Sequence, residues 1–152
     1  MGRRYIPALC HRLMGAPYLC VRLLMKLQLG ELNEQHLRDL GNEAVRLVLE
    51  RDFQALAQRF SYALAFGKDH IEAIAEDLQR ALALSGACDS RPSSSVVVKY
   101  FKPNNANLYA IVECLITFSN SNVILAELIV TKTNRDAWIT LEEISCPGAI
   151  SS

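Results

Sequence analysis

Alternation of apolar and polar residues in the carboxy-terminal third is the sequence feature that most constrains the fold. Every second residue is apolar over much of Leu108–Ser119 and again over Val123–Lys132. Successive side chains of a β-strand point to opposite faces, so this period of two predicts strands with one buried face. Val96–Phe101 and Ala137–Ile144 have strand composition as well. Short connections rich in Asn, Ser and Asp join these segments, and the sequence predicts a four-stranded antiparallel meander.

The need to bury one face predicts which side chains share it. A pairing of Ser119 with Val123 places two all-apolar sets opposite one another: Val112, Cys114, Ile116 and Phe118 against Ile124, Ala126, Leu128 and Val130. A slip of one residue would bring Glu127 into this face, and burying an unpaired charge is strongly unfavourable. The next hairpin adds Ala137, Ile139 and Leu141, so we expect this face to form the core.

Three helical patterns precede the strands, over residues 33–50, 52–67 and 69–86. Each begins at a residue type that caps helices well, in chain order Asn33, Asp52 and Asp69. Gly41 lies inside the first pattern, where it costs about 1 kcal/mol relative to alanine, and this indicates close packing. The expected architecture is therefore α+β, with three N-terminal helices packed on one face of the sheet.

Residues 1–24 differ from the rest of the chain. They contain four arginines and no acid, and Pro7, Gly15 and Pro17 are spaced so that they would break any helix. We expect either a loose extension or a translation start that really lies at Met25, followed by one domain over residues 25–152. The remaining chain has 12 Lys and Arg against 16 Asp and Glu. This balance disfavours nucleic acid as a partner and favours a basic protein.

Five cysteines without a CxxC spacing favour reduced thiols, and hence a cytoplasmic location. Cys88 and Cys146 flank the predicted sheet, and whether they pair stays open. No apolar run approaches the ~20 residues of a membrane span. The sequence predicts no metal site and no cofactor.

The second face of the predicted sheet is mixed, because apolar, aromatic and acidic side chains alternate across it. Like charges on adjacent strands are mildly destabilising, so their retention draws attention to this face. One interpretation is a set of solvated carboxylates. The other is a partner-binding face for a cationic protein, formed by Tyr109, Glu113, Glu127, Trp138 and Glu142.

The order of elements resembles the small cystatin-like α+β proteins of the nuclear transport factor 2-like superfamily. NEAVRLVLERDFQALAQRF is similar to their first helical pair, and WITLEEI is similar to their final strand. The layout also resembles small bacterial domains of unknown function, some of which are found near toxin genes. Enzymes of the superfamily place an Asp–His or Tyr–Asp pair inside the cone of sheet and helices. Here all histidines precede the sheet, and Tyr62 and Asp77 are the nearest equivalents, although Asp77 lies off the apolar stripe.

Two functions follow as hypotheses. The first is a non-catalytic binding module of the immunity or adaptor type that uses the mixed face. The alternative is a small-ligand-binding protein or enzyme with a pocket between helices and sheet. Its lining would be Phe53, Phe60, Tyr62, Cys114 and Phe118, and no residue stands out as catalytic. Homodimerisation through the mixed face is compatible with either.

Overall fold

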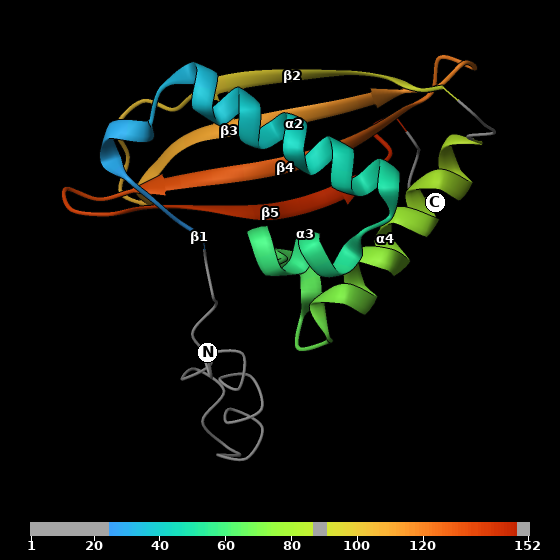
Figure 1. The fold of residues 1–152 in the computed structure, drawn as a ribbon, viewed down its shortest axis with the longest axis horizontal. Helices are drawn as coiled ribbons and strands as arrows, with labels where there is room; N and C mark the ends of the chain where they lie inside the picture. The colour runs from blue at the N-terminus through green and yellow to red at the C-terminus, as the bar shows by residue number, and fades with distance from the viewer. Residues whose placement is uncertain (1–24, 87–90, 149–152) are drawn as a thin grey trace.

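A five-stranded antiparallel sheet forms the centre of the computed structural model, which describes residues 25–86 and 91–148 (Figure 1). Its strands follow the order β1-β5-β4-β3-β2. They are β1 (Met25–Leu27), β2 (Ser93–Tyr100), β3 (Leu108–Thr117), β4 (Val123–Lys132) and β5 (Ala137–Ser145). The α+β class and the antiparallel meander are confirmed. The expected number of four strands is wrong, because β1 adds a fifth strand on the free edge of β5.

The predicted faces of the sheet are confirmed, but the predicted register is not. Thr117, rather than Ser119, pairs with Val123. The N–H of Phe118 donates to the carbonyl of Asn122 at 2.9 Å, and Ser121 has a left-handed φ of 66°. This three-residue hairpin loop ends β3 two residues early. Because the shift is an even number of residues, each side chain stays on its predicted face.

Three α-helices lie on one side of the sheet: α2 (Glu34–Glu50), α3 (Phe53–Phe60) and α4 (His70–Ser85). The 3₁₀ turns η3 (Leu29–Glu31) and η4 (Ala63–Ala65) accompany them. All three predicted caps are formed, since Asn33, Asp52 and Asp69 each accept a backbone N–H at 2.9 to 3.1 Å. The second helix ends at Phe60 rather than near Gly67, because Ser61 takes a positive φ of 60°.

Helix α2 runs across β2 and β3, whereas α4 packs beside β5 (Figure 1). Between these helices and the sheet lies one apolar core. The predicted core side chains of the strands, apart from the half-buried Phe118, are at most 1% exposed: Val112, Cys114, Ile116, Ile124, Ala126, Leu128, Val130, Ala137, Ile139 and Leu141. Within residues 25–86 and 91–148, none of the helices combines the length and apolar character needed to cross a bilayer.

The expectations for residues 1–24, and for Cys10, Cys20 and Cys88, concern positions outside the described residues. Of the remaining cysteines, Cys114 is a buried free thiol and Cys146 is a half-buried one. Burial raises the pKa of Cys114 to about 12, so this thiol stays protonated at neutral pH. We assign Cys114 a packing role.

Candidate functional site

The face of the sheet opposite the helices is covered by no helix or strand in the part of the chain that is described. Strand pairing arranges its side chains in three rows that cross β2, β3, β4 and β5. The rows are Ser95–Leu115–Leu125–Ser145, Val97–Glu113–Glu127–Glu143 and Lys99–Ile111–Ile129–Thr140. We call this surface the open face. Its middle row is acidic, and the rows on either side bring leucine and isoleucine pairs next to it.

The acidic row contains more carboxylates than the alternation predicts. Glu113 pairs directly with Glu127, and Glu127 pairs directly with Glu143. A β-bulge in β5 places Glu142 as the additional residue beside this last pair. Lys99 forms an ion pair with Glu113 at 2.7 Å. Among the described residues, Glu127, Glu142 and Glu143 form no ion pair.

Crowding of these carboxylates affects the ionisation of Glu127. Burial raises the pKa of this carboxyl above its ordinary value of 4.5, and the charges of Glu143, Glu113 and Glu142 raise it further. Lys99 acts in the opposite direction. A carboxylate held among like charges is stabilised by any cation that approaches it. The electrostatic character of the row therefore favours a cationic ligand group.

We expect Glu127→Gln to raise the free energy of unfolding at pH 7 by roughly 0.5 kcal/mol, because it removes like charges from directly paired positions. A raised native pKa means that the folded protein binds this proton more tightly than the unfolded chain. The stability contributed by the protonated carboxyl is therefore lost as pH rises above the unfolded value near 4.5. Urea denaturation should show that the free energy of unfolding of the variant exceeds that of the wild type by an amount that grows between about pH 4 and 7. An advantage that does not change with pH would contradict this interpretation.

The open face holds most, but not all, of the residues assigned to it from sequence. Glu113, Glu127 and the half-buried Trp138 lie on it, and Glu142 occupies the bulge at its margin. Tyr109 does not belong to it. A register irregularity between Leu108 and Ala110 turns its ring to the helix side, where it packs against the core.

Three contacts hold Tyr109 there. Its hydroxyl donates to the carbonyl of Leu32 at 3.5 Å, and its ring meets that of Tyr100 edge-on at 5.5 Å. The Nζ atom of Lys132 lies 5.0 Å from the ring centroid. The predicted position of Tyr109 on the open face is therefore wrong, because the irregularity in β3 breaks the alternation of side chains between the two faces.

The predicted pocket residues do not converge on one cavity. Phe60, Tyr62 and Cys114 are at most 1% exposed and belong to the core, against which Phe53 packs from its margin. Phe118 lines a small hollow of about 330 Å³ between α2, α4 and the hairpin side of β3 and β4. This hollow contains none of the other four residues.

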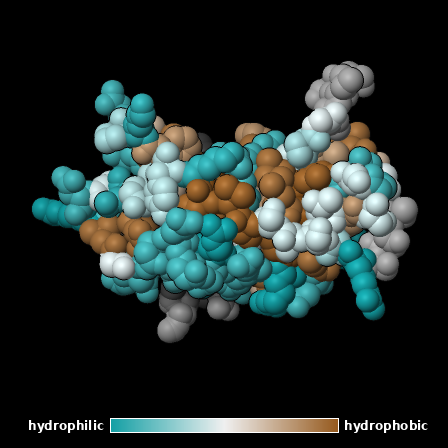
Figure 2. Space-filling model, turned by 90° about the horizontal axis from the view of Figure 1, so that it is seen from above, coloured by the Kyte–Doolittle hydropathy of each residue, from teal (hydrophilic) through white to brown (hydrophobic). Residues whose placement is uncertain are grey.

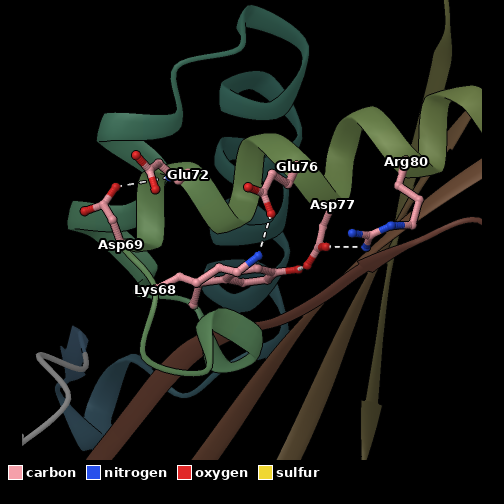
Figure 3. Close-up of polar contacts among 7 residues, drawn as sticks. Lys68, Asp69, Glu72, Glu76, Asp77 and Arg80 are labelled. Atoms are coloured by element: carbon pink, nitrogen blue, oxygen red, sulfur yellow. Dashed lines mark hydrogen bonds and ion pairs between the residues drawn. The ribbon is translucent and has the colours of Figure 1, made fainter.

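A larger cleft of about 630 Å³ lies elsewhere, between α4, η4 and the end of β5. Lys68, in the turn before α4, bonds to Glu76 at 2.7 Å, and on α4 itself Arg80 bonds to Asp77 at 2.5 Å (Figure 3). Tyr62 donates to the same Asp77 carboxylate at 2.6 Å. Tyr62 and Asp77 are the two residues that the resemblance singled out as nearest to a Tyr–Asp pair, and the structure brings them into contact. No local pattern predicts this contact, because the two residues are far apart in the chain. The exposed Phe66 and the half-buried Cys146 also line the cleft.

No family model, curated protein or solved structure matches this chain. The resemblance to the nuclear transport factor 2-like superfamily therefore stays a prediction. The fold and its geometry define an α+β protein with an uncovered, centrally acidic sheet face. Within the described residues, no group of three or more His, Cys, Asp or Glu is arranged to hold a metal ion.

Proposed function

We propose that this protein is a non-catalytic binding module that holds a protein partner on the open face, in the manner of an immunity or adaptor protein. One observation carries the proposal: a row of carboxylates crosses three adjacent strands between apolar rows, on a face that no described element covers. Carboxylates that crowd one another destabilise the free protein slightly. A cationic partner would relieve this repulsion when it binds, and the relief would add to the binding free energy.

The chemistry of the face indicates the chemistry of its partner. Leu115 and Leu125 pair on one side of the acidic row, and Ile111 and Ile129 pair on the other. A complementary surface presents one or two cationic side chains between apolar ones. Arginine fits this role well, because its planar guanidinium binds carboxylates in a bidentate manner and is weakly hydrated.

A second copy of the chain is a poor occupant of the same face. A two-fold axis through the middle of the face would place the acidic row against its own copy. Glu127, Glu142 and Glu143 form no ion pair among the described residues, so their charges would repel across the contact. The proposed partner is therefore a different, basic protein.

Small-ligand binding is a second candidate, favoured by the volume of the α4–β5 cleft. About 630 Å³ falls within the usual range of ligand sites. Its cations Lys68 and Arg80 are each paired with a carboxylate, however, which leaves their charges compensated. The open face has the greater uncompensated charge, and we place the primary function there.

A pair of synthetic peptides tests the proposal. One alternates leucine with arginine and the other alternates leucine with glutamate. We expect the arginine peptide to bind, and Glu113→Gln/Glu127→Gln to weaken its binding by about tenfold, which corresponds to about 1.4 kcal/mol. Calorimetric titration measures the affinity of the arginine peptide for the wild type and for the double variant. The affinity for the wild type should fall as salt is added.

The matched control is Glu50→Gln/Glu76→Gln, which removes two carboxylates from the exposed sides of α2 and α4. Glu50 and Glu76 form ion pairs with Arg46 and Lys68 at 2.6 and 2.7 Å, as Glu113 does with Lys99. The net charge of the protein thus changes equally in both double variants. Equal affinity loss in the two would show that overall charge, and not the open face, binds the peptide. The proposal would then be wrong.

A further inference from the structure

The outer edge of β2 is a surface separate from the open face. Within residues 25–86 and 91–148, β2 is the last strand of the sheet and pairs only with β3. The N–H of Phe101 bonds inward to Tyr109, whereas the carbonyl of Val96 is reached from outside by Arg38. Backbone groups alternate between the two sides of an antiparallel strand. The residues whose backbone N–H and C=O groups point away from β3 are therefore Ser94, Val96, Val98 and Tyr100.

The composition of this edge favours pairing with another strand. Its sequence is SSSVVVKY, in which Lys99 is the single charged residue. Val97, Tyr100 and the following Phe101 are 37%, 48% and 41% exposed. From the side on which β2 lies, the molecule presents a band of apolar surface bordered by hydrophilic groups (Figure 2). Long edges with apolar, β-branched residues tend to recruit further strands.

Arg38 covers the middle of this edge. It projects from α2, its Nη1 atom donates to the Val96 carbonyl, and its Nη2 atom bonds to Glu34 at 2.6 Å. The ion pair with Glu34 holds the guanidinium in place on the helix. A strand that pairs with β2 needs the Val96 carbonyl as an acceptor, so it competes with Arg38 for this group.

We propose that the β2 edge pairs antiparallel with the β2 edge of a second copy of this chain, and that Arg38 weakens this pairing. In a symmetric pairing centred on Val97, Val96 pairs with Val98 of the second copy and Lys99 lies opposite Ser95. The edge is thus self-complementary, because no like charges meet. The two sheets would join into one, and the open faces would stay free for a partner.

Electrostatics also favours the edge over the open face for a second copy. In the edge-paired dimer, Glu113 and its copy lie three strand spacings apart, which is roughly 14 Å. This separation exceeds the screening length of about 8 Å at physiological ionic strength. The acidic rows therefore do not oppose the pairing.

Sedimentation equilibrium at several concentrations tests the proposal. We expect wild-type protein to dimerise weakly and Arg38→Ala to dimerise at least about tenfold more tightly. Arg46→Ala is the matched control. Arg46 lies on the same helix and forms an i,i+4 ion pair with Glu50 at 2.6 Å, the counterpart of the Arg38–Glu34 pair. Arg46→Ala should dimerise like the wild type.

A second substitution identifies the surface. Val97 pairs with Glu113 within the monomer, so Val97→Lys places a cation beside a carboxylate in the free protein. In the dimer, the same change places the two introduced lysines opposite each other near the two-fold axis, where their charges repel. We expect Arg38→Ala/Val97→Lys to return to monomer. Equal association of Arg38→Ala and Arg46→Ala overturns the proposal, and so does a dimer that Val97→Lys leaves intact.

Circular dichroism checks that each variant is folded. If Arg38→Ala does not fold, wild type is compared with Val97→Lys at high concentration. The proposal then requires that the weak wild-type dimer is lost in Val97→Lys, and equal dimerisation overturns it. Association of β2 with strands of unrelated proteins, without a dimer of this chain, also overturns it.

Discussion

Replacement of Gly41 by alanine is expected to lower the free energy of unfolding by about 1–3 kcal/mol, although alanine is the better helix former by about 1 kcal/mol. Gly41 lies where α2 packs closely on β2 and β3. A Cβ atom there would lie 2.5 Å from Val96 Cγ1, 2.8 Å from Val112 Cγ1 and 3.3 Å from Cys114 Sγ. Real Cβ contacts are longer than the first two distances. Both valines are buried and have restricted rotamers, so α2 must move away from the sheet.

Gly30→Ala is the control for Gly41→Ala. It also adds one methyl group, but a Cβ at Gly30 meets no atom within 4 Å. We expect its free energy of unfolding to stay within about 0.5 kcal/mol of the wild-type value. Urea denaturation of the three proteins measures both effects. A Gly41→Ala protein as stable as wild type, or more stable, would show that the helix–sheet contact is looser than the structure has it.

Replacement of Tyr62 by phenylalanine is expected to cost about 2 kcal/mol of stability. Tyr62 is 1% exposed, and its hydroxyl donates to Asp77 at 2.6 Å. The hydroxyl also has a backbone hydrogen bond with Ile144 on β5. It thus ties α4 to the end of the sheet. Without the hydroxyl, the backbone of Ile144 loses this bond and Asp77 keeps its bond to Arg80.

Tyr100→Phe is the matched control, because Tyr100 is 48% exposed and loses the same single atom. We expect it to change stability by less than about 0.5 kcal/mol. Burial, and then the hydrogen bond to Asp77, raise the pKa of Tyr62 far above its ordinary value of 10.0. The stability contributed by the neutral hydroxyl is therefore constant at neutral pH and is lost as pH rises above 10. A similar loss in Tyr62→Phe and Tyr100→Phe would contradict this role.

Local patterns predict the regular parts of this fold well. The alternation around Glu127 correctly separates core from open face, since a one-residue slip would bury a charge. The caps Asn33 and Asp69 correctly place the starts of α2 and α4. β1 has three residues, too few to show a period of two, and the sequence does not reveal it. The hairpin register fails because the three-residue loop lies one residue earlier than predicted, with the left-handed Ser121 as its last residue.

The candidate site is predictable where the strands are regular and unpredictable where they are not. The shared face of Glu113 and Glu127 follows from the alternation in the two longest strands, so the sequence predicts it. Their direct pairing depends on the hairpin register, which the sequence does not predict. The position of Tyr109 and the pairing of Glu143 depend on irregular registers in β3 and β5. Bulges depend on the tertiary setting as much as on local sequence. The Tyr62–Asp77 contact likewise requires the packing of two separate elements.

The proposed function is binding of a cationic protein surface to the open face. Site-resolved NMR titration with the leucine–arginine peptide tests it most directly, because backbone resonances report which residues the peptide contacts. We expect the largest shifts in β3, β4 and β5 around Glu113, Glu127 and Glu143, with little change along α4. Shifts concentrated in α4 and around Arg80, with β3 and β4 unaffected, would contradict it and would place binding in the α4–β5 cleft.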